Sequence, residues 1–475
     1  MRWAPVLEAI LDNIVPLIYL SDLVLLVSML FLERGDPSKT LLWVVILLVI
    51  PVFGFVLYLF FGQTFYAKHA FRSVERSEIP SEYVNGSPSG VPEGCAGLAD
   101  ALYRAGAGIV TSDNDVRLFT DGNEKFDSLK EDIRNARRFV HLEYYIIRKD
   151  PLGDEIMSLL AQKAAEGVEV RLMVDALGFN TGASGKRALR EAGGKVAVFH
   201  SAAVCLLSPK KNNRNHRKIA VIDGRISYIG GFNIGEEYLG KGEFGHWRDT
   251  AVRIEGSATN ALSFRFSSDW KYACKEDLTA DPKYYAKACG MGDTPVQAVM
   301  GGPDVGRDNP IAFQYLMMVE NAERTLYIHT PYFDPNQACL MALRAAAMRG
   351  VDVRVIIPDV GDHPFVYWSN RKYAYEVMRS GVRVYEYHDG FVHSKSVVAD
   401  GRLCSVGSAN FDDRSMSLNF EGNAMIFSEE LGAEMDAAFL RDLGRCTEYT
   451  IGMYDSRTLL QRVSTSVSWM LSGQL

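Results

Sequence analysis

Two segments of the chain place a histidine, a lysine, an aspartate, a glycine and an asparagine at identical spacing. They are NHRKIAVIDGRISYIGGFN, residues 215–233, and VHSKSVVADGRLCSVGSAN, residues 392–410. Both fit the pattern H-x-K-x-x-x-x-D-x-x-x-x-x-x-G-[GS]-x-N. One copy could be a core strand with polar ends, but a second copy at the equivalent place of a repeat favours a shared catalytic role.

The spacing within each copy suits chemistry at phosphorus. Side chains alternate along a strand, so His216 and Lys218 face the same side, as do His393 and Lys395. A neutral imidazole can attack phosphorus to form a phosphohistidine, while an imidazolium protonates the leaving oxygen. We predict one site in which a histidine from each copy faces a single phosphate; the motif does not decide which histidine attacks.

Other polar residues of the motif have supporting roles in this scheme. The lysine ammonium groups and the amides of Asn233 and Asn410 would stabilise charge on the non-bridging phosphate oxygens. Asp223 and Asp400 complete the candidate catalytic set. An aspartate that ends a strand before a glycine is better suited to fixing the turn than to transferring protons.

Each histidine also needs a carboxylate that sets its tautomer and orientation. The candidates are Asp249 in WRDTAVRI and Glu421 in LNFEGNAMI; ordinary surface or turn acids are the alternative. Because the positive charge is built in, we expect no metal ion and no other cofactor. We also single out His329, which ends a strand of the repeat. The histidines outside the motif show no metal-ligand spacing: His69, His141, His200, His246, His329, His363 and His388.

The two motifs lie in an internal repeat. Residues 132–175 and 318–359 both read as the end of a helix, a strand, a helix, a glycine turn and a strand. Alternating strands and helices predict α/β units on mainly parallel sheets. We expect two homologous halves that share one active site: residues 113–290, and residues 291–475 with C-terminal helices.

The N-terminal part is strongly apolar. Residues 41–61 contain no charge and are long enough to cross a hydrocarbon core of about 30 Å. Residues 14–32 contain Asp22, which costs roughly 2.5 to 3.5 kcal/mol on insertion, so this segment is either a second span or an interfacial one. We predict a transmembrane helical hairpin over residues 1–63, followed by a connector over residues 64–112.

The basic residues around the hairpin predict its orientation. Arg2, Lys68, Arg72 and Arg76 at its outer ends outnumber the two basic residues of its turn. By the positive-inside rule, both ends of the hairpin and the catalytic body are expected on the cytoplasmic side.

Bulk composition disfavours several classes of protein. With 48% apolar and 23% charged residues the composition is that of a globular chain, and a net charge of -7 argues against a protein that wraps nucleic acid. Seven scattered cysteines indicate reduced thiols rather than a disulfide or zinc framework. The run PKKNNRNHRK is either a solvated loop or an anion-collecting rim at the site; its basic residues before and beside His216 are Lys210, Lys211, Arg214 and Arg217.

The duplicated motif resembles that of the phospholipase D superfamily. The apolar start, with TPYFDP, RGVDVRVIIP, GGFNIGEEY, WRDT and RSMSLNFE, is similar to bacterial cardiolipin synthases of the phospholipase D type over nearly the whole chain. This resemblance implies phosphatidyl transfer between two phosphatidylglycerol molecules, giving cardiolipin and glycerol without consumption of a nucleotide. It favours His216 as the nucleophile and His393 as the acid and base, in a multi-pass protein of the bacterial inner membrane.

Related chemistry leaves other interpretations open. A hydrolase of the same superfamily would let water take the second step, and a phosphatidylserine synthase would use another acceptor. The acidic balance and the hairpin disfavour a nuclease, and the two intact motifs disfavour a non-catalytic membrane scaffold. The sequence does not decide the oligomeric state, for which a homodimer is one option.

The chain departs from the family pattern at three places, one of which is Ser257 in IEGSA, where the family usually has proline. Gly231 stands where the second copy has Ser408, so a hydroxyl contact to the phosphate is expected from Ser408 alone. The chain ends in SWMLSGQL rather than in a proline-leucine tail. The expected terminal helix, about residues 456–471, either meets the membrane or packs in the core.

Overall fold

The computed structural model describes residues 91–178, 183–200, 213–287, 291–305 and 309–472, together with Tyr83 and part of residues 14–58. The chain forms two units. The first comprises residues 1–75 and 203–212, and the second comprises residues 76–202 and 213–475.

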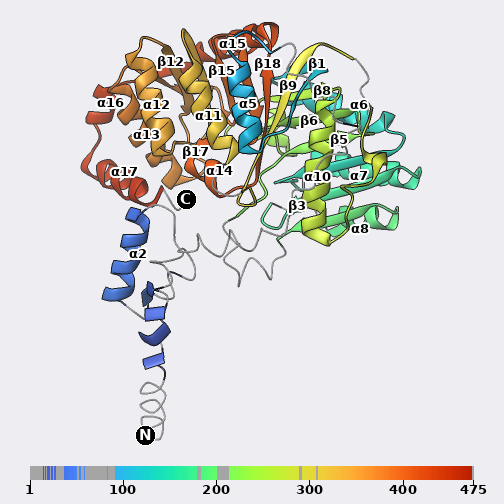
Figure 1. Ribbon diagram of the computed structural model, residues 1–475, viewed down its shortest axis with the longest axis horizontal. Helices are drawn as coiled ribbons and strands as arrows, with labels where there is room; N and C mark the ends of the chain where they lie inside the picture. The colour runs from blue at the N-terminus through green and yellow to red at the C-terminus, as the bar shows by residue number, and fades with distance from the viewer. Residues whose placement is uncertain are drawn as a thin grey trace, which may run out of the picture. The chain divides into compact units, whose positions relative to one another are not determined.

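In the first unit, the structure describes helix α2, Pro37–Val49 (Figure 1). It begins at a proline, which is tolerated in the first turn because the missing N–H has no helical partner there. Most of the predicted hairpin lies outside the described residues. Of the helices that the structure does describe, none is long and apolar enough to span a bilayer.

The second unit contains the sheet. Its strands are β1 (Val110–Phe119), β2 (Phe139–Tyr144), β3 (Glu169–Asp175), β4 (Lys195–Phe199), β5 (Ile219–Ile222), β6 (Ile226–Gly230), β7 (Trp247–Arg248), β8 (Ala251–Glu255), β9 (Thr294–Gly301), β10 (Thr325–His329), β11 (Phe333–Asp334), β12 (Asp352–Pro358), β13 (Arg383–Tyr387), β14 (Phe391–Val392), β15 (Ser396–Ala399), β16 (Leu403–Gly407), β17 (Phe411–Asp412), β18 (Glu421–Phe427) and β19 (Cys446–Tyr449).

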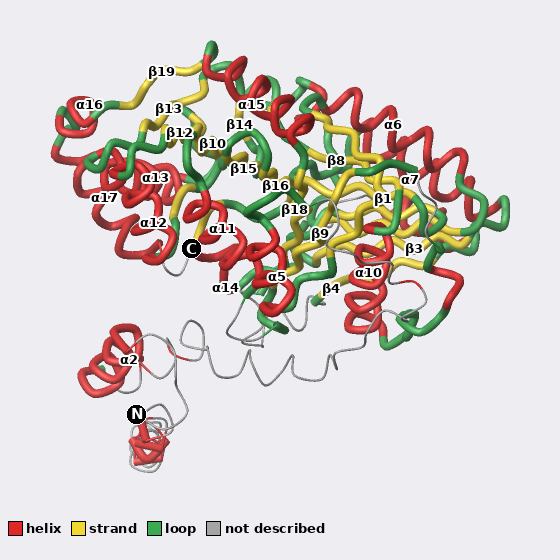
Figure 2. The backbone as a smooth tube through the Cα atoms, turned by 45° about the horizontal axis from the view of Figure 1, so that its top comes forward, coloured by secondary structure: helices red, strands yellow, loops and turns green. Residues whose placement is uncertain are grey.

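Helices cover both faces of this sheet: α6 and α10 lie on opposite sides of it in the first half, as do α15 and α11 in the second (Figure 2). The helices of the second unit are α5 (Ala96–Ala105), α6 (Gly122–Asn135), α7 (Pro151–Ala165), α8 (Ala183–Glu191), α10 (Ala258–Cys274), α11 (Pro310–Asn321), α12 (Gln337–Met348), α13 (Pro364–Met378), α14 (Asp413–Ser417), α15 (Glu429–Leu443), α16 (Ile451–Asp455) and α17 (Leu459–Ser472), with short 3₁₀ turns η3 (Glu236–Leu239) and η4 (Pro282–Tyr284).

The order of the strands confirms the two predicted halves. Among the described residues, the main sheet has 15 strands in the order β19-β13-β12-β10-β15-β16-β18-β9-β1-β8-β6-β5-β2-β3-β4. Read outward from the central β9–β1 pair, the two sides carry equivalent strands in the same sequence order, and β19 is an addition at one edge. The β9–β1 pair is antiparallel, as a pseudo-two-fold axis between the halves requires.

The expectation of mainly parallel sheets is wrong. Parallel neighbours are confined to β2, β3 and β4 in one half and β10, β12 and β13 in the other. The remaining neighbours in the main sheet are antiparallel, and they include the hairpin that each histidine motif builds in place of a helical crossover. The Asp-Gly pairs in the motifs were the sequence signal for these hairpins.

Both hairpins turn at the motif aspartate. Asp223 and Gly224 have φ of 54° and 71°, and Asp400 and Gly401 have φ of 55° and 63°. These left-handed values at both central residues are typical of a type I′ turn, for which Asp-Gly is a preferred pair. In each turn, a backbone N–H at the third position beyond the strand end closes the loop, as in the Arg225 N–H donating to the Ile222 carbonyl over 3.1 Å.

The equivalent connections also have equivalent helix caps. Asp150 accepts a hydrogen bond from the Gly153 N–H at the start of α7, and Asn336 accepts one from the Cys339 N–H at the start of α12. Side chains of this type satisfy N–H groups that the helix itself leaves unpaired. Each half has its own buried apolar core behind these helices.

The predicted connector is partly ordered structure of the second unit. Helix α5 lies within residues 64–112, and its Leu98, Ala99 and Leu102 are buried in the core of the second half. Strand β1 begins at Val110, before the expected boundary at residue 113. The boundary expected at residues 290–291 falls at the edge of the residues left undescribed.

The motif aspartates hold the start of a neighbouring strand. The Asp223 carboxylate accepts hydrogen bonds from the backbone N–H groups of Arg137, Arg138 and Phe139, at 2.8 to 2.9 Å, where β2 begins. Asp400 does the same where β10 begins, accepting from Glu323, Arg324 and Thr325 at 2.7 to 3.0 Å. Both carboxylates are bonded to backbone, which agrees with the expectation that these aspartates fix the turn rather than transfer protons.

We expect Asp223→Ala to lower the free energy of unfolding by about 2 to 4 kcal/mol, because three backbone N–H groups lose their acceptor and alanine disfavours a positive φ. Asp223→Asn keeps one oxygen acceptor and tolerates this φ, so its loss should be smaller. Urea unfolding of the detergent-solubilised protein measures both. Equal stability of Asp223→Ala and the wild type would contradict the anchoring role.

Candidate active site

Each histidine segment crosses to the opposite half. The His216 N–H donates to the Phe420 carbonyl over 2.9 Å, and the Phe420 N–H donates to the Arg214 carbonyl over 2.8 Å. In the other half, β14 pairs in parallel with β7, and the His393 N–H donates to the Arg248 carbonyl over 2.8 Å. The two histidines are therefore positioned by backbone of the half to which they do not belong.

The same crossing brings together the histidines and the predicted orienting carboxylates. Glu421 of the second half lies beside His216, with its two carboxylate oxygens 2.9 and 3.1 Å from Nδ1. Asp249 of the first half lies beside His393, with Oδ2 2.6 Å from Nδ1. A carboxylate at Nδ1 fixes the tautomer that carries its proton there, which leaves Nε2 of a neutral ring with a lone pair.

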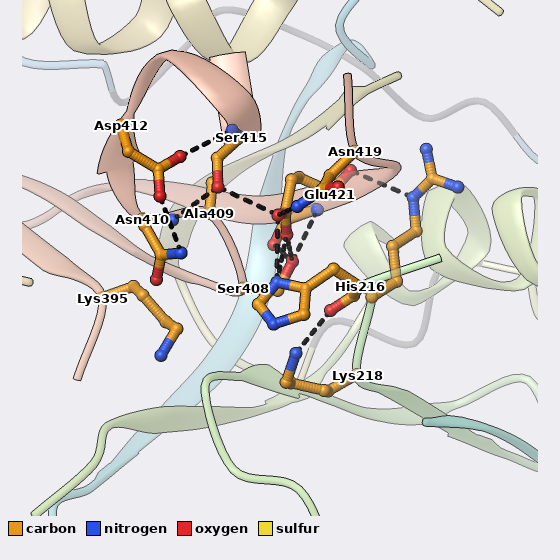
Figure 3. Close-up of polar contacts among 12 residues, drawn as sticks. His216, Lys218, Lys395, Ser408, Ala409, Asn410, Asp412, Ser415, Asn419 and Glu421 are labelled. Carbon is orange, nitrogen blue, oxygen red and sulfur yellow. Dashed lines mark hydrogen bonds and ion pairs between the residues drawn. The ribbon is translucent and has the colours of Figure 1, made fainter. Parts of the chain in front are cut away.

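Glu421 is held by several donors besides His216 (Figure 3). The Ser408 hydroxyl donates to Oε2 over 2.5 Å, and Oε1 accepts from the Ser415 hydroxyl at 3.0 Å and the Asn419 amide at 3.2 Å. The expected phosphate contact of Ser408 is corrected by this arrangement. Its one proton is committed to Glu421, and its side chain is fully buried.

The Asp249 carboxylate accepts fewer hydrogen bonds than Glu421, and it lies close to the backbone of Gly231. Its Oδ1 accepts from the Thr250 N–H over 2.7 Å, and its Oδ2 from His393. A Cβ on Gly231 would lie 2.1 Å from Asp249 Oδ1. This approach explains why the first copy has glycine where the second has serine: any side chain at residue 231 would overlap the Asp249 carboxylate.

Burial sets the charge states of the two histidine–carboxylate pairs. It lowers the pKa of His216 to about 4, although Glu421 works against this shift. Burial also acts to raise the pKa of Glu421, but attraction to His216 and Lys218 and the Ser408 hydrogen bond outweigh it and keep that pKa below its usual value. The site therefore holds a neutral His216 next to an ionised Glu421.

In the second pair, the pKa values of the histidine and the carboxylate are shifted differently. Burial lowers the pKa of His393 well below its usual value, and the nearby Lys395 and Lys218 lower it further. Burial raises the pKa of Asp249 to about 6, against the attraction of Lys395. His393 is therefore neutral, and a bound anion would favour its protonation by offsetting the charge of the lysines.

The motif lysines lie behind the histidines. The Lys218 ammonium donates to the His216 carbonyl over 2.6 Å, and the Lys395 ammonium donates to the His393 carbonyl. Burial lowers their pKa values to about 7 and about 8. An ammonium group has three donors, so two remain on each lysine after this bond.

The motif asparagines line the site, but neighbours engage their amides. Asn233 accepts from the Ile146 N–H over 3.1 Å and donates to the Tyr238 hydroxyl over 3.1 Å. Asn410 donates to Asp412 over 3.0 Å, and its Oδ1 is buried without a hydrogen-bond partner. Each amide nitrogen carries a second proton that these bonds do not use.

Both histidines open onto one cavity of about 740 Å³. This volume is within the range of small-ligand sites. The two asparagines line it with the histidines, and Trp247, Phe244 and Val366 give part of its wall an apolar character. A phosphodiester with apolar substituents fits such a lining, because its charged centre meets the polar floor.

Comparison with known proteins identifies the family of this arrangement. The family described as "Cardiolipin synthase, PLD-like domain" matches residues 129–270 and 315–443, which contain both histidine segments and both carboxylates. A cardiolipin synthase of Staphylococcus aureus (strain Mu50) is 38% identical over 479 residues, covering 98% of this chain and 97% of its own length. The chain belongs to the cardiolipin synthase family with phospholipase D-like domains.

Other members and structural neighbours agree with this assignment. A cardiolipin synthase of Listeria welshimeri is 41% identical over 458 residues, covering 93% of this chain and 95% of its own. Residues 21–63 match the family described as "Phospholipase_D-nuclease N-terminal". The crystal structure of phosphatidylserine synthase from Haemophilus influenzae covers 79% of this chain and all of its own with a TM-score of 0.59 at 16% identity, which shows a shared fold.

In this cardiolipin synthase family member, Arg217 is not part of a rim. Its side chain is fully buried, and its guanidinium donates to Asp269 over 2.7 Å and to the carbonyls of Glu421 and Gly301 over 3.0 and 2.6 Å. Arg214 does line the cavity. Lys210 and Lys211, the other basic residues of the predicted rim, lie outside the described residues.

His329 is a buried structural residue. Its Nε2 lies 3.1 Å from Asp442 and its Nδ1 lies 3.1 Å from Ser396. Asp442 also accepts from Arg248 over 2.8 Å, so this group supports the backbone that binds His393. Of the remaining histidines, His363 lines the cavity.

The sequence interpretation missed several residues of the site. The Tyr238 hydroxyl lies 3.3 Å from Nδ1 of His393, and Ser415 and Asn419 donate to Glu421. Their signal was present, since GGFNIGEEY and RSMSLNFE carry the family resemblance and contain all three. Spacing alone could not assign them, because their partners lie in the other half or across a turn.

We expect Arg217→Ala to lower the free energy of unfolding by about 3 to 5 kcal/mol, because it removes one partner of a buried ion pair and strands two backbone carbonyls. Arg187→Ala is the control and should cost less than about 1 kcal/mol, since the Arg187 side chain is 75% exposed. Urea unfolding compares the two. Equal losses would place Arg217 at the surface.

Proposed function

We propose that this chain synthesises cardiolipin by transferring a phosphatidyl group from one phosphatidylglycerol to another, with release of glycerol. The observation that carries the proposal is the pair of histidines from two halves at one cavity, each with a carboxylate at Nδ1. Membership of the cardiolipin synthase family supports the choice of substrate.

We infer that His216 attacks first. Its ring is neutral and its Nδ1 proton is held by an ionised Glu421, so Nε2 offers a lone pair to phosphorus. Attack forms an N–P bond and breaks the P–O bond to the glycerol headgroup. The adjacent ionised carboxylate stabilises the positive charge that the ring acquires.

His393 then acts as the general acid and, in the second step, as the general base. It takes up a proton at Nε2 as the anionic diester enters, and gives this proton to the leaving glycerol oxygen. The terminal hydroxyl of a second phosphatidylglycerol returns a proton to His393 as it attacks phosphorus, and the N–P bond breaks. One phosphodiester replaces another, so atoms and charge balance without a nucleotide.

Lys218 and Lys395 would stabilise the charge on the non-bridging oxygens. Each retains ammonium donors beyond the bond to its histidine's carbonyl. Asn233 and Asn410, which line the cavity, would contribute their remaining amide protons. The proposed site of action is a bacterial inner membrane, with phosphatidylglycerol in the bilayer as substrate.

Incubation of the purified protein with labelled phosphatidylglycerol tests the reaction directly. Cardiolipin and glycerol in equal amounts are expected, with the rate unchanged in excess chelator. Phosphatidic acid as the main product would instead identify a hydrolase. A product formed only when serine and a nucleotide-activated lipid are added would identify a phosphatidylserine synthase.

His216→Ala and His393→Ala should each reduce synthesis by about 10³-fold or more, because each removes a group that bonds to a reacting atom or moves its proton. His388→Ala is the control, since His388 is exposed and pairs with Asp359. Acid-quenched mixtures analysed by mass spectrometry should carry the phosphatidyl group on His216. Substantial turnover of either active-site variant would exclude the two-histidine scheme.

The pKa of the attacking histidine predicts the response to acid. His216 is active when neutral, and because its pKa is about 4 the neutral form persists as the pH falls through 6.5. We expect kcat/KM for phosphatidylglycerol in detergent micelles not to fall between pH 7 and pH 5. A decline with a midpoint near 6.5, the ordinary histidine value, would contradict a buried neutral nucleophile.

A further inference from the structure

Helix α17, Leu459–Ser472, carries large apolar side chains that no other described element covers. Leu460, Val463 and Met470 are 76%, 51% and 77% exposed. Their spacing places them on one face of the helix, together with Val467. A soluble helix would turn such a face inward.

The opposite face of α17 is polar and buried. It packs against α13, Pro364–Met378, as Figure 1 shows. The residues on this face are Thr465, Ser468 and Ser472, and Thr465 and Ser468 are 1% and 2% exposed. The helix is thus inside out: hydroxyl groups are buried and large hydrocarbon side chains face outward, which is stable where the surroundings are apolar.

Charge and aromatic placement point to the same surroundings. Arg462 is the one charged residue of α17, and the helix contains no acidic residue. Trp469 lies at the border between the two faces, and the Lys372 ammonium is 5.3 Å from the centre of its ring. A tryptophan beside a basic residue, at the margin of an apolar face, is typical of the interface between lipid headgroups and hydrocarbon.

The C-terminal end of α17 adjoins the cavity. Ser472 lines the cavity, and its hydroxyl lies 3.4 Å from the Tyr373 hydroxyl on α13. Val366, at the start of α13, lines the cavity as well, and its neighbour Phe365 is 40% exposed. The exposed apolar side chains of α17 and the exposed Phe365 therefore belong to two packed helices that both reach the cavity wall.

We propose that the outward face of α17, with Phe365, docks onto a phospholipid bilayer and holds the cavity opening against it. This inference rests on the proposed function, since it supplies the route by which a bilayer lipid reaches the histidines. An acyl chain drawn through water would cost about 0.8 kcal/mol per CH₂, whereas a docked opening lets the headgroup enter while the chains stay in apolar surroundings.

Photochemical crosslinking tests the docking surface in the full chain. The protein is placed in vesicles of phosphatidylcholine and phosphatidylglycerol that contain a trace of phosphatidylcholine with a diazirine in its acyl chain. After irradiation, tryptic cleavage at Arg462 releases a peptide that begins at Val463, and we expect it to carry crosslinked lipid. The internal control is Met341 and Met348 on α12, which are 61% and 69% exposed but lie on another helix and should remain unmodified.

A pair of variants links docking to catalysis. Leu460→Glu with Met470→Glu places two charges on the outward face and should lower kcat/KM on vesicles about tenfold, with activity on detergent-dispersed phosphatidylglycerol within about twofold of the wild type. Met348→Glu, at a similarly exposed position on α12, should change neither. Unchanged thermal unfolding confirms that all variants are folded.

The outcomes separate the docking surface from the reaction. Activity in micelles with an unmodified Val463 peptide, or equal vesicle activity of the double variant, would overturn the docking proposal and leave the proposed function intact. Loss of crosslinking together with a dimeric mass that the double variant abolishes would assign the face to a second copy of the chain. Absence of turnover in both vesicles and micelles would refute the proposed function itself.

Discussion

The contact on which this site depends is the exchange of carboxylates between the two halves. Glu421 of the second half holds Nδ1 of His216, and Asp249 of the first half holds Nδ1 of His393. Neither half has a complete histidine–carboxylate pair of its own. The central β9–β1 pairing and the short parallel bridges at Phe420 and Arg248 therefore position the chemical groups as well as the backbone.

The two pairs are related by pseudo-symmetry but differ in electrostatics. Glu421 accepts from three side chains besides His216 and stays ionised, whereas Asp249 accepts from one backbone N–H and His393 and has its pKa raised to about 6 by burial. A reaction that needs one nucleophile and one proton carrier gains from such a difference. Duplication supplied two equivalent histidines, and the residues around them made the two unequal.

The expectations that the structure changed concerned the surroundings of two side chains and the direction of the strands. Ser408 contains a hydroxyl at a motif position, but that hydroxyl is used by Glu421. Arg217 lies in a basic run, yet it is buried against Asp269 because the strand that follows His216 turns it inward. The parallel sheet was inferred from alternating helices and strands, although the Asp-Gly pairs already indicated antiparallel hairpins.

The sequence by itself determined the two halves, the duplicated motif and the set of histidines and carboxylates, because periodicity and repeated spacing are local properties of the chain. It also contained the apolar pattern of α17, but not which face of that helix would be buried. Only the tertiary structure decided that each histidine takes its carboxylate from the other half, and which backbone N–H groups Asp223 and Asp400 bind. The histidine–carboxylate pairs join residues 144 and 205 positions apart, and the two halves of the sheet bring them together. The aspartates bind backbone N–H groups, which every residue type except proline has, so the sequence does not identify these partners.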